Sequence, residues 1–253
     1  ELLRRVLIAL QIAQGLEPKR RAKVHLAQFD LPLPASADPK AMLYDFSEVT
    51  DELHGYIWVF PTPLYDHQGR QLANVGIMQV GSTRLGGGMP SLLKEGLSRH
   101  GIELGDTRVN FHPEWAFDPS FAFSAPNILT VGDAAGIDPL FGEGLHQCIE
   151  YGVKAASEIK QAFQKNDFSF TGYRRKILWS SMGMEMRLLR IPAKRLYKPG
   201  NELWTSFIFN GTYLAKAMAA QGQGKIQLHR RVIPILGRAL WHIMTGNKQL
   251  PAE

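Results

Sequence analysis

Length, composition and charge narrow the class of protein first. The chain has 253 residues, 45% of them apolar and 21% charged, so it can bury a sizeable core and is not a disordered chain. Its net charge of +6 and isoelectric point near 9.4 favour an anionic partner, without choosing among nucleic acid, a membrane surface and a phosphorylated substrate. Its single cysteine, Cys148, excludes an internal disulfide framework and is compatible with a reducing cytoplasm.

The start of the chain and its apolar stretches bear on targeting. The sequence begins at Glu1 with neither an initiator methionine nor a signal-peptide pattern, so we expect upstream residues to be missing. The best candidate for a membrane span, residues 203–215, is too short and contains Asn210, which predicts that no helix crosses a membrane. We expect a cytoplasmic location, with peripheral membrane contact left open.

The first half of the chain has the pattern of an antiparallel sheet. Four strand-like segments are separated by turn clusters such as those at 32–34 and 66–70. These predicted strands cover residues 24–30, 42–46, 56–60 and 73–80. Because the connections are short, neighbouring strands are expected to run antiparallel. A short helix over 91–100 and a further strand over 108–112 follow.

The pattern changes after residue 126. Residues 128–131 form a continuous apolar run, which suits a strand buried on both faces. A long helix is predicted over 143–163, with one apolar face that is expected to pack on a sheet. That face comprises Leu145, Cys148, Ile149, Gly152, Ala155, Ala156, Ile159 and Phe163. Beyond residue 166 the chain reads as helical, over 182–189, 203–218 and 232–244.

The segment between the apolar run and the long helix contains the candidate ligand-binding residues. A strand that ends at Gly132 brings Asp133 to the sheet edge where open α/β sheets bind ligands, and its carboxylate can accept hydrogen bonds from sugar or ribityl hydroxyls. Pro139, Gly142 and Gly144 then form a stiff, sterically open loop before the helix. The free N–H groups of a helix N-terminus can hold an anionic oxygen, such as that of a reduced flavin. Taken alone, Gly-Asp after a strand is more often simply a turn.

The whole run resembles a known motif. It consists of Gly132-Asp133-Ala134-Ala135-Gly136, Asp138-Pro139-Leu140 and Gly142-Glu143-Gly144. It is similar to the second FAD motif of the geranylgeranyl reductases and of the wider class that includes p-hydroxybenzoate hydroxylase-like monooxygenases and flavin-dependent halogenases. The resemblance implies that Asp133 binds the ribityl chain and that the loop lies against the pyrimidine edge of the flavin. The implied cofactor-binding set is Gly132, Asp133, Pro139, Gly142, Glu143, Gly144 and Leu145.

A second resemblance lies upstream. Residues 55–61, Gly-Tyr-Ile-Trp-Val-Phe-Pro, and 74–78, Asn-Val-Gly-Ile-Met, are similar to the geranylgeranyl-reductase pattern Tyr-x-Trp-x-Phe-Pro followed by Asn-Val-Gly-x-Gly. The aromatics of one strand share a face, and they could wall an apolar pocket or form a core stripe. The implied substrate pocket comprises Tyr56, Trp58, Phe60, Pro61 and Gly76. Met78 replaces the family's second glycine and the hairpin is longer at 63–70, so a prenyl chain is one lipophilic substrate among several.

The family's dinucleotide-binding start, G-x-G-x-x-G, does not occur in this sequence, and the resemblance covers residues 1–165. It implies an α/β fold with α+β character. The expected parts are a remnant of the FAD-binding domain (1–22), an antiparallel-sheet substrate domain (23–125), the returning FAD-binding strand and helix (126–165) and a helical C-terminal region (166–253). The chain is then a fragment, or a second polypeptide supplies the first half. Alone, it is expected to hold FAD poorly.

The resemblance implies an FAD-dependent oxidoreductase that transfers a hydride to a C=C bond of a lipophilic, isoprenoid or similar substrate, with NAD(P)H or another donor as reductant. A monooxygenase or halogenase of the same superfamily is the first alternative. A non-catalytic module bound to a partner or a membrane is the second, because the basic stretch 174–198 could bind anionic lipid headgroups or form a solvated helix face. No catalytic residue, metal-ligand spacing or nucleic-acid-binding module is recognisable in the sequence.

Overall fold

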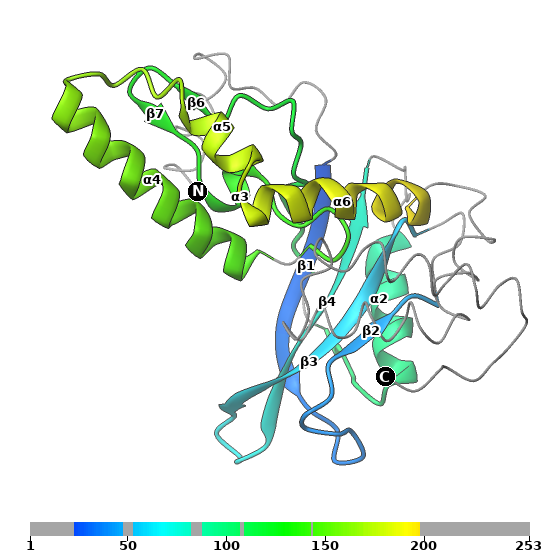
Figure 1. The fold of residues 1–253 in the computed structure, drawn as a ribbon. Helices are drawn as coiled ribbons and strands as arrows, with labels where there is room; N and C mark the ends of the chain where they lie inside the picture. The colour runs from blue at the N-terminus through cyan, green and yellow to red at the C-terminus, as the bar shows by residue number, and fades with distance from the viewer. Residues whose placement is uncertain (1–22, 48–52, 82–87, 107–108, 143, 198–253) are drawn as a thin grey trace, which may run out of the picture. The chain divides into compact units, whose positions relative to one another are not determined.

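The computed structural model describes residues 23–47, 53–81, 88–106, 109–142 and 144–197 (Figure 1). The predictions for residues 1–22, 203–218 and 232–244 lie outside this part of the chain. The described residues divide into two compact units. One, the sheet unit, comprises residues 23–116 and Tyr197; the other, the helical unit, comprises residues 117–196.

The sheet unit contains the antiparallel sheet that the sequence predicted. Its strands stand in the order β2-β3-β4-β1-β5, and every pairing is antiparallel. They are β1 (Lys23–Pro32), β2 (Leu43–Asp45), β3 (Gly55–Tyr65), β4 (Gln71–Val80) and β5 (His112–Trp115). The last strand differs from the expected 108–112, because the residues that pair with β1 are His112 to Trp115.

The hairpin between β3 and β4 extends well beyond the aromatic segment. Its strands pair from Gly55 to Tyr65, with a register shift between Pro61 and Tyr65. In the turn, the Asp66 carboxylate accepts hydrogen bonds from the backbone amides of Gln68, at 2.8 Å, and Arg70, at 2.9 Å. A side chain that satisfies the turn's own amides explains why the sequence predicts this turn correctly.

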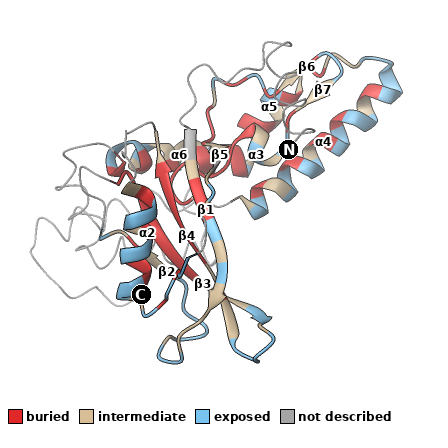
Figure 2. Ribbon diagram, turned by 180° about the vertical axis from the view of Figure 1, so that it is seen from behind, coloured by how far each residue is buried: buried red, intermediate tan, exposed pale blue. Residues whose placement is uncertain are grey.

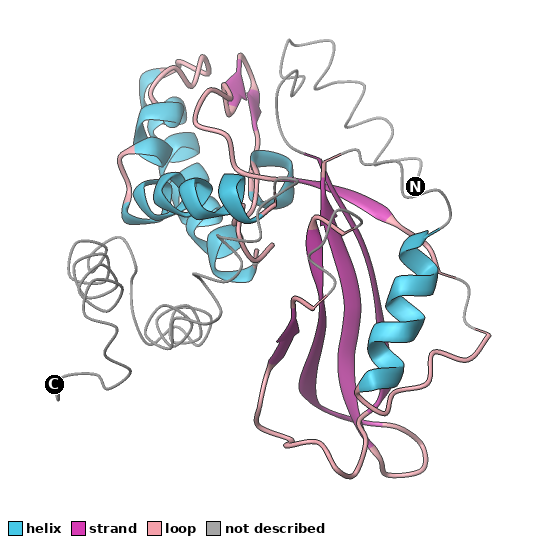
Figure 3. Ribbon diagram, turned by 90° about the vertical axis from the view of Figure 1, so that its right-hand side faces the viewer, coloured by secondary structure: helices cyan, strands magenta, loops and turns pink. Residues whose placement is uncertain are grey.

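One face of the sheet packs against helix α2 (Gly88–Arg99), as Figures 1 and 3 show. Residues of alternating position on β3 and β4 form the sheet side of this core, and Figure 2 shows in red that the central part of these strands is buried. The core contains Ala27, Ile57, Val59, Val75, Ile77, Met89, Leu93 and Leu97. The other face of the sheet is therefore the one that carries Tyr56 and Trp58.

The helical unit combines a small hairpin with helices. Its elements are β6 (Ser124–Ala125), β7 (Ile128–Leu129), α3 (Gly132–Ala135), α4 (Leu145–Lys165), α5 (Tyr173–Leu178) and α6 (Ser181–Leu196). Aromatic and methionine side chains fill its core, among them Phe117, Phe123, Tyr151, Tyr173 and Met186. The helical reading of residues 182–189 is confirmed.

The predicted strand over 128–131 is shorter and less buried than expected. Only Ile128 and Leu129 are in β7, which pairs antiparallel with β6, and both are half-buried. Val131 is 42% exposed. A strand buried on both faces belongs to a sheet with a packed layer on each face, whereas β7 forms only a two-stranded sheet with β6 among the described residues.

The long helix forms where expected, but it buries a different face. The buried positions of α4 are Gln147, Tyr151, Ala155, Glu158 and Ala162. Of the face predicted to be buried, Ala155 is buried and Cys148 is half-buried, but the other members are exposed: Leu145, Ile149, Gly152, Ala156, Ile159 and Phe163. The reason is that α4 packs on α5 and the aromatic core of its unit, so Tyr151 and Ala155 decide which side is covered.

Among the described residues, no helix combines the length and the apolar character that crossing a membrane requires.

Candidate functional site

Asp133 and the start of helix α4 lie together. Asp133 is the second residue of α3, and its side chain is exposed. Its Oδ1 lies 3.4 Å from the position that a Cβ atom on Gly144 would occupy. The Cys148 thiol, one turn into α4, donates to the same oxygen over 3.7 Å. The carboxylate and the helix start therefore face one another, as the sequence predicted.

The first turn of α4 keeps its N–H groups uncapped by side chains. Gly144 is the N-cap residue, and no side-chain hydrogen bond caps the helix. The first helical hydrogen bond runs from the Cys148 amide to the Gly144 carbonyl, at 2.8 Å. The N–H groups of the residues between them have no acceptor within the helix. Such a helix start next to a carboxylate can hold an anionic oxygen and a hydroxyl-bearing chain at once.

The loop before α4 is fixed by Asp138. Its buried carboxylate accepts a hydrogen bond from the Leu140 amide at 2.7 Å, and its carbonyl accepts one from the Gly142 amide at 3.0 Å. Gly142 has φ +66°, a conformation that favours glycine. Pro139 is buried beside them, and Glu143 lies outside the described residues. Asp138 thus shapes the loop, while Asp133 remains accessible.

Two buried tyrosines hold the segment that carries Asp133. The Tyr173 hydroxyl donates to the Thr130 carbonyl and the Tyr151 hydroxyl to the Gly136 carbonyl, each at 3.1 Å. Burial, and then the nearby Glu158 charge, raise the pKa of Tyr173 well above its ordinary value, so it stays a neutral donor. Sequence reasoning missed both roles. The available signal was that a buried tyrosine hydroxyl needs a partner.

In the sheet unit, the aromatic residues of β3 form one continuous row. Tyr56 and Trp58 are buried, and their ring centroids lie 6.0 Å apart; those of Trp58 and Phe60 lie 6.2 Å apart. Tyr44, on β2, adds contacts of 5.4 Å to Tyr56 and 4.8 Å to Phe60. The shared face of the three predicted aromatics is therefore present.

Gly76 and Asn74 on β4 complete this row. Gly76 pairs with Trp58, and a Cβ there would come within 2.3 Å of the indole Cζ2 atom. The indole Nε1–H donates to Asn74 Oδ1 at 2.9 Å, and Asn74 donates in turn to Asp30 Oδ1 at 3.2 Å. Pro61 pairs with Ala73, which belongs to the α2 side of the sheet. Pro61 therefore does not belong to the aromatic row.

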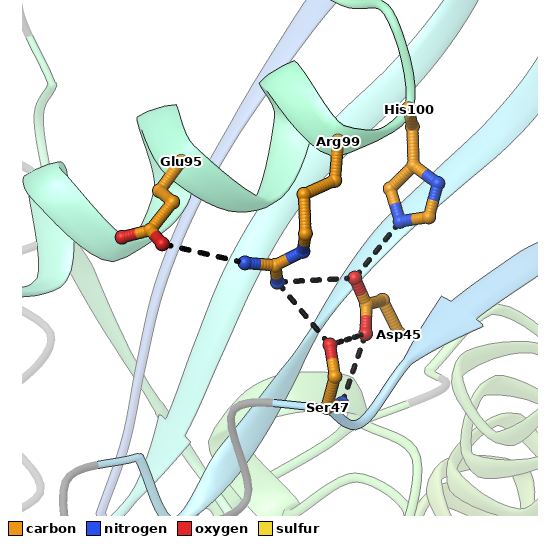
Figure 4. A network of polar contacts seen from close by, with 5 residues as sticks. All are labelled: Asp45, Ser47, Glu95, Arg99 and His100. Atoms are coloured by element: carbon orange, nitrogen blue, oxygen red, sulfur yellow. Dashed lines mark hydrogen bonds and ion pairs between the residues drawn. The ribbon is translucent and has the colours of Figure 1, made fainter.

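A polar network at the edge of the sheet unit was not anticipated (Figure 4). Asp45, at the end of β2, binds His100 Nε2 at 2.8 Å and the Arg99 guanidinium at 3.3 Å. The Ser47 hydroxyl also donates to Asp45. Burial by itself raises the pKa of Asp45, but the hydrogen bonds from Ser47, His100 and Arg99 outweigh it and lower the pKa to about 2. Ser47 and His100 both bind the carboxylate, so the group ties β2 to the end of α2 rather than activating a nucleophile.

The described residues contain no group of three or more His, Cys, Asp or Glu side chains placed to hold a metal ion.

Comparison with known proteins adds an independent observation. No protein-family model matches the chain. Digeranylgeranylglycerophospholipid reductase from Thermoplasma volcanium is 33% identical over 121 residues, and that from Thermoplasma acidophilum is 32% identical over 119 residues. Over that stretch the chain is similar to these two geranylgeranyl-lipid reductases. The matched stretch spans 46% of this chain but only 28% of the length of each relative.

A solved structure shares the fold of this chain. A mutant of the halogenase PltM in complex with FAD matches with a TM-score of 0.51 at 14% identity, over 94% of this chain and 49% of the halogenase chain. At that identity the likeness concerns the fold alone. The mixed architecture of helices and an antiparallel sheet is thus shared with that protein.

Proposed function

We propose that this chain is part of an FAD-dependent oxidoreductase and carries the ring side of the flavin site. The observation that carries the proposal is the Asp133 carboxylate lying against the glycine-capped start of α4. In the proposed site, Asp133 accepts hydrogen bonds from the ribityl hydroxyls. The first-turn amides of α4 face the pyrimidine edge, where a helix N-terminus stabilises negative charge.

The residues present fit a flavin. A Cβ atom on Gly144 would lie 3.1 Å from Ile137 Cγ2 and 3.4 Å from Asp133 Oδ1, so only glycine leaves the Asp133 carboxylate uncrowded. Asp133 itself is exposed and is not consumed by an ion pair among the described residues.

The proposed reaction is the reduction of a C=C bond in a lipophilic, isoprenoid or similar substrate. When bound, reduced FAD supplies the hydride, and NAD(P)H or another donor supplies the electrons. The relatives' name, digeranylgeranylglycerophospholipid reductase, supports an isoprenoid lipid. The aromatic row of Tyr56, Trp58 and Phe60 supports an apolar substrate surface, because its rings contact one another edge-on or tilted along one face of the sheet. The chain's own residues would bind and orient both molecules and exclude water.

A monooxygenase or halogenase is the second candidate, supported by the fold shared with the PltM halogenase. The two candidates differ in their need for oxygen. A C=C reductase forms product under strictly anaerobic conditions with reduced flavin present. A product that forms only with oxygen identifies the second candidate.

The test of the flavin site is a titration of the full chain with FAD, followed by quenching of flavin fluorescence. We expect weak binding, with a dissociation constant approaching ~1 mM. Asp133→Ala should weaken it roughly tenfold, the effect of losing a charge-assisted hydrogen bond. The matched control is Asp106→Ala, which removes an exposed carboxylate of the sheet unit. Equal affinity of the Asp133 and Asp106 variants would exclude the proposed role.

A further inference from the structure

A groove between α4 and α5 plays no part in the proposed flavin site. It is open, has a volume of about 670 Å³, and lies within the helical unit. Its lining includes Val153, Lys154 and Ser157 from α4, and Arg175, Lys176 and Trp179 from the α5 segment. No carboxylate is among the residues that line it. The groove therefore combines cations with an indole and an aliphatic side chain.

The positive charge of the groove is not fully compensated. Lys154 pairs with Glu150 at 2.8 Å, and Lys176 pairs with Glu158 and donates to Gln161 Oε1 at 3.0 Å. Arg175 is exposed and forms no ion pair or side-chain hydrogen bond with any described residue. A guanidinium that has no partner and borders a groove is suited to a phosphate, whose oxygens it can bind in a bidentate manner.

The apolar part of the groove is unusually exposed. Trp179 is 70% exposed and Val153 is 64% exposed. The Arg187 guanidinium lies 5.4 Å from the centroid of the Trp179 ring, a cation–π distance that holds the indole and adds a further positive charge. Tryptophan is favoured where an apolar contact and a polar surface meet. The Ser180 hydroxyl, also in the lining, is not available to a ligand, because it donates to the Ile177 carbonyl and accepts from the Gly183 amide.

We propose that this groove binds the phosphate of an amphiphilic phosphoester, a lipid whose headgroup lies on Arg175 and whose apolar part lies on Trp179 and Val153. A lipid fits better than a nucleotide because one of the two apolar contacts is aliphatic and Arg187 already stacks on the indole. Ser157, in the same lining, provides a hydroxyl for the headgroup. The site does not depend on the flavin proposal, since it uses none of the residues around Asp133.

The test is calorimetric titration of the full chain, without FAD, with dihexanoyl phosphatidic acid, which is soluble as a monomer. Dihexanoyl phosphatidylcholine, inorganic phosphate and ADP are titrated in parallel. We expect the phosphatidic acid to bind most tightly. Arg175→Gln should weaken it roughly tenfold. Lys160→Gln, which removes an exposed cation of α4 outside the groove, should leave it unchanged. Trp179→Ala should weaken the binding of the phosphatidic acid but not that of inorganic phosphate.

Each other outcome overturns the proposal. Equal affinity of the Arg175 and Lys160 variants for phosphatidic acid would show that the groove does not bind it. If inorganic phosphate binds as tightly as the lipid, the apolar part of the groove does not contribute to binding. If ADP binds more tightly than the lipid, the ligand is a nucleotide instead. Asp133→Ala should leave the lipid affinity unchanged, so failure of the flavin site and failure of this groove give separate results.

Discussion

The indole of Trp58 lies across Gly76 on the neighbouring strand, and the two residues are cross-strand partners in the β3–β4 hairpin. This relationship explains why the aromatic segment and the Asn-Val-Gly segment occur together. A glycine opposite a large aromatic lets the ring lie flat on the sheet, and Asn74 then takes the indole N–H. The two segments are therefore one structural unit.

Replacing Gly76 with alanine should destabilise the sheet unit strongly. The new Cβ would lie 2.3 Å from the Ala27 carbonyl oxygen and 2.3 Å from the Trp58 ring, and the former is backbone that cannot move aside. We expect a loss of about 2–3 kcal/mol in the free energy of unfolding, measured by urea denaturation. Gly152→Ala is the control, because a Cβ there meets nothing within 4 Å. It should be neutral or stabilising, by up to ~1 kcal/mol.

The hydrogen bond between Trp58 and Asn74 should be measurable by a double-mutant cycle. Asn74→Ala leaves a buried indole N–H unpaired, which costs about 1–3 kcal/mol. In a Trp58→Phe background that donor is absent, so the same substitution should cost clearly less. A coupling energy near zero would show that the contact does not contribute to stability.

A side chain at Gly144 should block the flavin site without unfolding the chain. The φ of Gly144, −128°, lies outside the left-handed region that favours glycine, but a Cβ there would lie 3.1 Å from Ile137 Cγ2 and 3.4 Å from Asp133 Oδ1. Gly144→Val is expected to weaken FAD binding at least tenfold, while far-ultraviolet circular dichroism stays unchanged. Gly152→Val, in open space on the same helix, is the matched control. Unaltered FAD affinity in the Gly144 variant would argue that the flavin binds elsewhere.

Tyr173 should act as a positioning residue for the segment that leads to Asp133. Tyr173→Phe removes the donor to the Thr130 carbonyl and leaves that buried acceptor unpaired. We expect a stability loss of about 1–2 kcal/mol and weaker FAD binding. Tyr65→Phe, on the exposed end of the hairpin, should change neither quantity. A stability loss with unchanged FAD binding would restrict Tyr173 to a structural role.

The Asp45 network should make stability depend on pH in acid. The pKa of Asp45 is about 2 in the folded chain, against an ordinary value of 3.8, so the unfolded state takes up the proton first. Its contribution, on the order of 1 kcal/mol, is complete above pH ~4 and is lost as the pH falls towards ~2. The Asp45→Asn variant should be less stable at neutral pH, and its free energy of unfolding should fall less steeply between pH ~4 and ~2. Identical slopes for both proteins in urea denaturation would contradict this.

The sequence by itself determined the local features. Alternating strands, the Asp66 turn, the glycine loop and the boundaries of the long helix all follow from short-range pattern, because each depends on the φ/ψ preferences and spacing of neighbouring residues. The meeting of Asp133 with the start of α4 was also predictable, since the segment between them, with its glycine turns and the fixed Asp138 loop, is short.

Only the tertiary structure decided which surfaces meet. The sequence pattern of α4 indicated a buried face with Ile149 and Phe163, whereas its packing on α5 buries Tyr151 and Ala162. The partners of Trp58, Asp45 and Tyr173 lie 16, 55 and 43 residues away in the chain. Such contacts depend on strand register and helix docking. Those properties arise from the packing of the whole unit, which no short stretch of sequence encodes.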